Sequence, residues 1–331
     1  MIAPTVLWPA LLGIVFLAVG IVTYRRDIAG ASPREAFGLV AFGPALVAAS
    51  LAAFAGEHFT ATASLAQLVP KWLPGRLFIA YLVGAAHFAA ASSFATRRYV
   101  RWAAFFLAVM FALFALLMDL PAAITHPGVR IAWSLAARQA TFSIGALALF
   151  ATVTKDRWPN SSNVLAAIAR LWTAGVLVFY GIEHVLYPRF APGVPSMAPT
   201  AAWVPAPTAI AIATGILLIG FGLAMLAERY ASAAAAACGA LMVLLTLALY
   251  VPQFFIARTV PQHVVAINFV FDTLLFGGTM LVISRAIADT TRRNIAEPGR
   301  VGQVVPPQRP RSYSDLNASI GFTLLARRAG R

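Results

Sequence analysis

Long apolar runs separated by short polar turns make up most of the chain as far as about position 285. A helix needs about 20 mostly apolar residues to cross the hydrocarbon core of a bilayer. Nine runs have about this length. They predict membrane-spanning helices at 6–24, 36–58, 76–95, 102–118, 131–153, 164–187, 206–227, 231–251 and 264–284. The pattern therefore predicts an all-α polytopic membrane protein.

Composition excludes a soluble protein, and the distribution of basic residues predicts the orientation of the helices in the membrane. Of the 331 residues, 60% are hydrophobic and 11% are charged, whereas a soluble domain carries about 25% charged residues. An outside N-terminus places 19 of the 25 basic residues on the inner side and six on the outer side. Positive charge gathers on the cytoplasmic side of membrane proteins. We therefore expect a multi-pass protein of the bacterial cytoplasmic (inner) membrane with a cytoplasmic C-terminus, and the net charge of +14 calls for no nucleic-acid partner.

The chain repeats part of itself. Trp72-Leu73-Pro74 recurs as Trp203-Val204-Pro205, 131 residues later, and Leu120-Pro121 recurs as Val251-Pro252 at the same displacement. Glu57-His58 recurs as Glu183-His184 after 126 residues, and the five-residue difference falls in a proline-rich outer loop. A shared order of such motifs indicates duplication. We predict a leading helix with its inner loop (1–34), two parallel four-helix repeats (35–158 and 159–288) and a basic, mostly disordered cytoplasmic tail (289–331). The apolar spacing within 314–328 allows a short interfacial helix, and the favoured alternative is a basic tail that rests near anionic lipid.

The repeated unit resembles the DoxX-like family of small four-helix membrane proteins. The resemblance rests on Gly-Glu-His-Phe at 56–59, Leu-Val-Pro-Lys-Trp-Leu-Pro-Gly at 68–75, the arginine-rich inner turn at 97–101 and Asp119-Leu120-Pro121. The second copy lacks the lysine and much of that loop. Some family members are membrane subunits of thiosulfate:quinone oxidoreductases or accompany redox-defence enzymes. The resemblance thus implies an integral membrane subunit of a quinone-linked oxidoreductase. Such a subunit would have an outward-facing site and a partner protein. The alternative is a non-catalytic membrane anchor or assembly subunit of a larger complex.

The two Glu-His pairs are the first candidate site, because ionisable side chains at membrane depth are costly. If the pairs converge across a pseudo-twofold axis, His58 and His184, with Glu57 and Glu183, would suit a metal ion or haem. The alternative is that both pairs cap helix ends. The single cysteine, Cys238, excludes an internal disulfide or a thiolate cluster.

Three further aromatic positions carry open alternatives. His87 near the middle of its span is a candidate for ligation or proton transfer, or it makes a hydrogen bond between helices. Trp72 and Trp203 would line a quinone head-group pocket, or they belong to an aromatic belt at the membrane surface.

Opposite charges in the last helix of each repeat form the final prediction. Arg138 and Asp272 lie at similar depth, and Gln139 matches Asp272 at a displacement of 133. A charge at that depth needs a partner. We expect Arg138 and Asp272 to pair where the repeats pack. The alternative joins Arg138 to carbonyls or lipid phosphate and Asp272 to Asn268. The outer loop at 188–205 should cover the outer face and leave Ser196 accessible to labelling.

Overall fold

The protein is a bundle of membrane-spanning helices. The computed structural model describes residues 3–29, 36–197 and 199–296, and the predicted tail helix near 314–328 lies outside them. Met1–Thr291 form one compact unit. Within the described residues, nine helices are long and apolar enough to cross a membrane, and the only β pairing is an isolated bridge between Phe190 and Pro199. The predicted all-α polytopic fold is confirmed.

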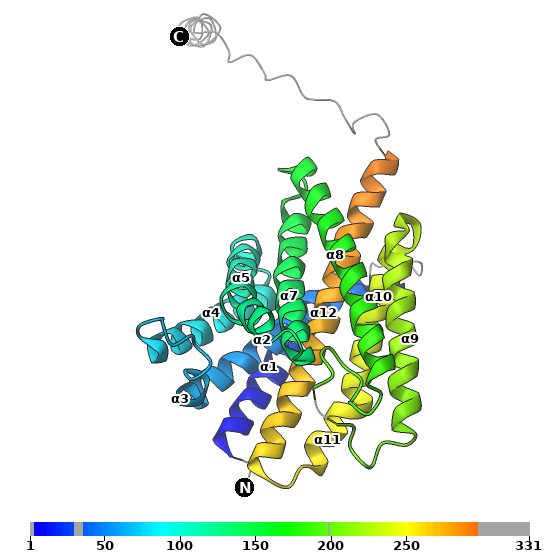
Figure 1. Ribbon diagram of the computed structural model, residues 1–331. Helices are drawn as coiled ribbons and strands as arrows, with labels where there is room; N and C mark the ends of the chain where they lie inside the picture. Colours follow the sequence, from blue (N-terminus) through cyan, green and yellow to red (C-terminus); the bar gives the residue numbers. More distant parts are fainter. Residues whose placement is uncertain (1–2, 30–35, 198, 297–331) are drawn as a thin grey trace, which may run out of the picture. The chain divides into compact units, whose positions relative to one another are not determined.

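Several of the nine spans contain more than one element (Figure 1). In chain order, the elements are α1 (Pro4–Ala29), η1 (Ala36–Phe42) with α2 (Gly43–Thr60), the short α3 (Thr62–Leu65), α4 (Arg76–Thr96), α5 (Val100–Phe114) with η2 (Ala115–Asp119) and α6 (Leu120–Thr125), α7 (Arg130–Thr154), α8 (Pro159–Leu186), α9 (Pro207–Leu226), α10 (Glu228–Leu245) with η3 (Thr246–Tyr250) and α11 (Val251–Ile256), and α12 (Val260–Ala296).

Helix α12 lies at the centre of the packing. Its span is the most buried of the nine, and it contacts α2, α7 and α10 (Figure 1). Glycines allow these close approaches: a Cβ added to Gly278 would lie 3.0 Å from the carbonyl oxygen of Gly43, and one added to Gly145 would lie 2.2 Å from Thr279 Cγ2. Because α12 has 37 residues, it is roughly 55 Å long and exceeds the ~30 Å hydrocarbon core.

Two π-helical turns interrupt the spans at matching places. The turn η2 precedes Leu120-Pro121, and η3 precedes Val251-Pro252, so the two turns are 131 residues apart. Proline has no N–H group to donate to the carbonyl four residues earlier, which accounts for the loss of regular α-helical bonding there. The helices continue after both turns as α6 and α11, so the fourth and eighth spans extend beyond their predicted ends, to Thr125 and Ile256.

Other local features recur with the same displacements. Gly75 and Ala206, which precede α4 and α9, both have left-handed backbones, with φ of 65° and 45°. Cβ atoms added to Gly84 and Gly215 would lie 2.6 and 2.9 Å from the Cβ atoms of His58 and His184. These recurrences accord with the predicted duplication.

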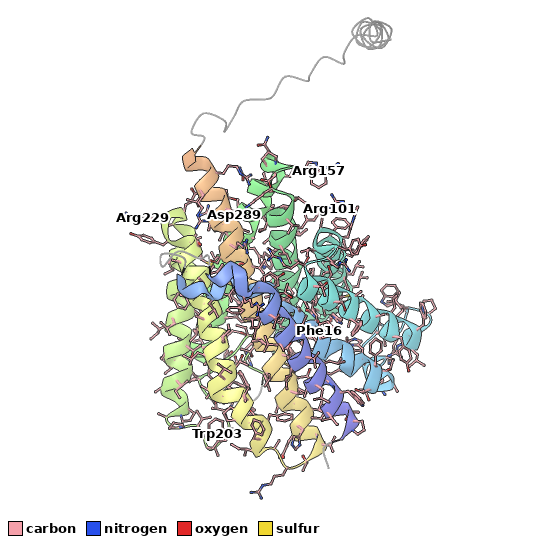
Figure 2. The ribbon with its side chains drawn as sticks, turned by 180° about the vertical axis from the view of Figure 1, so that it is seen from behind. Phe16, Arg101, Arg157, Trp203, Arg229 and Asp289 are labelled. Carbon is pink, nitrogen blue, oxygen red and sulfur yellow. The ribbon has the colours of Figure 1, made fainter. Side chains whose placement is uncertain are left out.

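The labelled arginines and Trp203 lie at opposite ends of the bundle. Figure 2 shows Arg101, Arg157 and Arg229 toward one end and Trp203 at the opposite end. The arginine end corresponds to the predicted inner face and the Trp203 end to the predicted outer face.

Candidate functional site

An ion pair joins the two halves inside the bundle. Arg138 on α7 donates a hydrogen bond from Nη1 to Asp272 Oδ2 on α12 at 2.7 Å. Both side chains are largely buried, with 13% and 19% of their surface exposed. This is the pair expected from their matched depth. The alternative partner is not used, because Asn268 donates its amide to the carbonyl oxygen of Val264 on its own helix.

Two more carboxyl groups lie near this pair. Asp119, the last residue of η2, interacts electrostatically with Arg138. Glu57 on α2 interacts electrostatically with Asp272. We call Glu57, Asp119, Arg138 and Asp272 the Arg138 cluster. It contains three carboxyl groups and one guanidinium, of which Asp119 and Asp272 interact with Arg138 and Glu57 interacts with Asp272. Its formal charge is −2 when every carboxyl group is ionised.

The Arg138 cluster contains buried polar atoms without partners. Glu57 Oε1, Asp119 Oδ2 and Arg138 Nε are all shielded from solvent and make no hydrogen bond in the described structure. Buried polar groups are nearly always hydrogen-bonded, and each exception calls for an explanation such as water, an ion or a function. Three such atoms in one cluster identify it as the main candidate site.

A second polar group lies nearer the outer loop. Glu183 on α8 accepts hydrogen bonds at Oε1 from Ser134 Oγ at 2.7 Å and from Arg130 Nη1 at 3.3 Å. Arg130 also donates to the carbonyl oxygen of Ser196 at 2.9 Å, and Tyr180 donates its hydroxyl to the carbonyl oxygen of Ser134 at 2.7 Å. We call these five residues the Arg130 network. Its one carboxyl group faces one guanidinium.

Tyr180 connects the two groups. Its side chain is fully buried, and it interacts electrostatically with Arg138, Asp272 and Asp119 as well as with Glu183. Polar groups therefore extend from the outer loop through the Arg130 network to the Arg138 cluster.

The outer loop folds back into the protein beside His184. Residues 191–196 are buried, and Tyr250 donates its hydroxyl to the carbonyl oxygen of Pro192 at 2.6 Å. Ser196 is 1% exposed, so the expectation that it is accessible to labelling is wrong. Its carbonyl hydrogen bond to Arg130 holds that part of the loop inside.

His184 has no lone pair left for a metal ion. The backbone N–H of Gly193 donates to Nε2 at 3.0 Å, so the ring hydrogen is on Nδ1, which donates to the carbonyl oxygen of Tyr180 at 2.7 Å. Within the described ranges, no group of three or more His, Cys, Asp or Glu side chains is arranged to hold a metal ion. The metal or haem site predicted from His58 and His184 is therefore not formed by these side chains.

His58 faces a different neighbour. Its Nδ1 lies 2.8 Å from the carbonyl oxygen of Phe54, one turn earlier, and its ring centroid is 5.3 Å from that of His87. His87 is 3% exposed, and neither ring nitrogen has a hydrogen-bond partner in the described structure. The hydrogen bond between helices proposed for His87 is thus absent, and its ring packs against Phe54 and Phe111.

The two tryptophans lie on the surface. Trp72 is 66% exposed and Trp203 is 38% exposed, and neither makes a ring contact or a hydrogen bond with another described residue. These positions suit the aromatic-belt interpretation better than a shared pocket.

The sequence analysis missed the contribution of Arg130, Ser134 and Tyr180. Ser134 and Tyr180 are polar residues inside predicted spans, and Arg130 directly precedes one, so their depth was the available signal. The comparisons add no further assignment: no family model matches the chain, no curated protein matches it, and no solved structure matches it.

Proposed function

We propose that this protein is the membrane subunit of a quinone-linked oxidoreductase of the DoxX-like type, in which the Arg138 cluster holds and transfers protons. The observation that carries the proposal is the excess of carboxyl groups around Arg138, together with the unpartnered atoms of the cluster.

Charge balance is the physical reason for assigning protons to this cluster. A net charge buried in a low-dielectric environment is strongly unfavourable, and carboxyl groups that share a site titrate as a coupled set. Two protons on Glu57, Asp119 and Asp272 would balance the single guanidinium. The cluster would therefore store protons that can leave when a neighbouring group takes them up.

The Arg138 cluster offers a hydrogen-bond donor that a quinone head group would accept. Arg138 Nε–H has no acceptor in the described structure, and a quinone carbonyl oxygen is an acceptor. When bound, a quinone accepts two electrons and two protons. Glu57 Oε1 and Asp119 Oδ2 would hold protons next to it.

Proton supply would follow the polar groups from the outer side. Glu183 and Ser134 are hydrogen-bonded at 2.7 Å, and Tyr180 is bonded to Ser134 and interacts electrostatically with Arg138. Electrons would come from a partner protein on the outer side, which makes the chain one subunit of a larger complex.

Infrared difference spectroscopy of the purified protein tests this function. We expect a protonated-carboxyl stretching band in the resting protein and a shift of this band when decylubiquinone is added. Glu57→Gln and Asp119→Asn should each remove part of the band. Glu228→Gln is the control, because the Glu228 carboxylate is 80% exposed and pairs with Arg170 elsewhere. A resting protein without the band overturns the proton store. A band that is present but does not shift when decylubiquinone is added overturns the quinone-linked function and leaves the proton store intact.

A second candidate, a proton-coupled carrier of a small solute, is favoured by the two π turns. Irregular helices at membrane depth occur where backbone lines a binding site or cavity. Asp119 and Tyr250 end the two turns at equivalent positions, and both interact electrostatically with groups of the Arg138 cluster. Proton uptake into proteoliposomes that requires an added solute, and is lost in Asp119→Asn, would select this function.

The proposed orientation places the Arg130 network on the outer side of the bacterial inner membrane. Met197 is 43% exposed and replaces Ser196 as the labelling position. Met197→Cys should react with a membrane-impermeant maleimide in intact cells, and Ser312→Cys, outside the described residues, only after lysis. The native Cys238 is fully buried and should stay unreacted. The reverse pattern would invert the orientation.

A further inference from the structure

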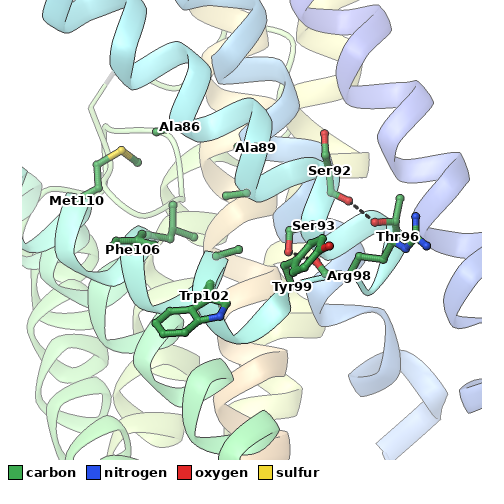
Figure 3. A pocket seen from close by; sticks show the side chains of 13 residues that line it. Ala86, Ala89, Ser92, Ser93, Thr96, Arg98, Tyr99, Trp102, Phe106 and Met110 are labelled. Carbon is green, nitrogen blue, oxygen red and sulfur yellow. Dashed lines mark hydrogen bonds between the residues drawn. The ribbon is translucent and has the colours of Figure 1, made fainter.

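A groove of about 570 Å³ lies between the end of α4 and the beginning of α5 (Figure 3). Small side chains of α4, including Ala86 and Ala89, form one side, and Trp102 and Phe106 of α5 form the other. The volume is within the range of sites that hold small molecules, about 300–1,000 Å³. The groove is independent of the Arg138 cluster and of the function proposed for it.

The groove has one apolar end and one polar end. Figure 3 shows Ser92, Thr96 and Arg98 together on one side, with Met110 on the opposite side. An occupant that matches both ends has a long apolar portion and a polar head. This is the chemistry of a lipid.

The charge of the polar end selects an anion. Arg97, Arg98 and Arg101 stand within five residues, and no Asp or Glu occurs from Arg76 to Met118. The Arg98 side chain is exposed and makes no ion pair or hydrogen bond with another described residue. Arg101 stacks over the ring of Trp102, with Cζ 4.7 Å from the ring centroid. The groove thus presents a guanidinium without a counter-ion.

The turn that carries Arg98 is held in an unfavourable conformation. Arg97 and Tyr99, on either side of it, have φ of 59° and 57°, a left-handed backbone that crowds any side chain against the following carbonyl oxygen. Ser93 stabilises the turn with two hydrogen bonds. Its hydroxyl donates to the carbonyl oxygen of Arg98, and its backbone carbonyl oxygen accepts the Arg98 N–H at 3.1 Å. Such strain is concentrated at binding and active sites.

The equivalent turn of the second half lacks these features. Arg229-Tyr230 correspond to Arg98-Tyr99, and the counterparts of the left-handed Arg97 and Tyr99 are Glu228 and Tyr230, neither of which has a positive φ. Glu228 supplies a carboxylate at this place and pairs with Arg170 at 3.0 Å. The strained turn is therefore a property of the first half, and Arg229 provides a matched control.

We propose that the α4–α5 groove binds an anionic phospholipid, with an acyl chain along the alanines of α4 and the phosphate on Arg98. A lipid of the inner leaflet would present its head group at this height in the proposed orientation.

Native mass spectrometry of the delipidated protein tests the proposal, with phosphatidylglycerol and phosphatidylcholine as probes. We expect one phosphatidylglycerol to bind at least 10-fold more tightly than phosphatidylcholine. Arg98→Gln should remove this preference, whereas Arg229→Gln should keep it. Ala89→Trp should block the exposed groove and weaken binding of the lipid without unfolding the protein, as checked by its melting temperature.

Three results would overturn the proposal. Equal binding of the two lipids would indicate bulk bilayer lipid only. Equal effects of Arg98→Gln and Arg229→Gln would indicate general surface charge. Competition by inorganic phosphate as effective as that of phosphatidylglycerol, with no effect of Ala89→Trp, would indicate a phosphate site that uses no acyl chain.

Discussion

The Arg130 network and the Arg138 cluster are both built around a buried arginine, but they differ in charge and in hydrogen bonding. In the Arg130 network, one carboxyl group faces one guanidinium, and the arginine also binds the carbonyl oxygen of Ser196. The Arg138 cluster has three carboxyl groups for one guanidinium, and three of its polar atoms have no partner in the described structure. In the Arg130 network the atoms without a partner are Glu183 Oε2 and Ser196 Oγ.

The difference separates a structural role from a chemical one. A charge-balanced network fixes the outer loop, because Arg130 bonds both the Glu183 carboxylate and the carbonyl oxygen of Ser196. An unbalanced cluster changes its free energy with every proton or ligand that it gains or loses. Substitutions in the two groups should therefore differ in their effect on stability.

Arg138→Ala should have the largest effect. Removal of one partner from a buried ion pair typically costs about 3–5 kcal/mol, because the other charge is left uncompensated. Here Asp272 would lose its hydrogen-bonded partner and Asp119 would lose a nearby positive charge, so we expect a strong loss of yield and of melting temperature in detergent. The exchange Arg138→Asp with Asp272→Arg should restore part of the loss. An exchanged protein no better than the sum of the single changes would contradict a direct pair.

Neutralising one carboxyl group should have opposite results in the two groups. Glu183→Gln leaves Arg130 without its counter-ion and should destabilise the protein by about 1–3 kcal/mol. Glu57→Gln replaces a carboxyl group that would hold a proton in the resting Arg138 cluster, so no charged partner is lost and the melting temperature of the variant should stay constant or rise. Thermal unfolding of both variants in one detergent measures the contrast. Equal destabilisation would mean that the two groups do not differ in charge balance.

His184→Ala should have the smallest effect on stability, about 1 kcal/mol, because it removes the acceptor of the Gly193 N–H. The loop should then open more often. The labelling rate of Ser196→Cys with a soluble maleimide reports this opening: slow in the otherwise native protein and several-fold faster with His184→Ala. His58→Ala is the control, since His58 contacts His87 and is bonded to Phe54 on its own helix. Equal rates in the two backgrounds would show that His184 does not hold the loop.

Most of the fold follows from the sequence, because run length alone identifies a spanning helix. The Arg138–Asp272 pair could also be anticipated, since depth in the membrane can be counted at 1.5 Å per residue. From the sequence, Asp119 stands out only as part of the Asp119-Leu120-Pro121 motif of the DoxX-like resemblance. Its approach to Arg138 depends on the π turn, where about one extra residue rotates the helix face by ~100°.

The role of His184 could not be predicted for a different reason. Its partner Gly193 is in an irregular segment whose path is set by contacts with Arg130 and Tyr250, from two other helices. No periodicity in the sequence encodes such a path. The repeated Glu-His motif suggested equal roles for the two histidines, whereas their surroundings differ: His184 bonds the outer loop and His58 packs against His87.

The distance along the chain between Arg138 and Asp272 has a consequence for biogenesis. The two residues are 134 positions apart, and α12, the most buried span, is made after the other eight. At roughly 5–20 residues per second, a ribosome takes on the order of ten seconds to proceed from Arg138 to Asp272. During that interval α7 carries a guanidinium without its later counter-ion and the other helices lack their central packing surface. Newly made spans would therefore have to remain beside the insertion machinery until α12 arrives.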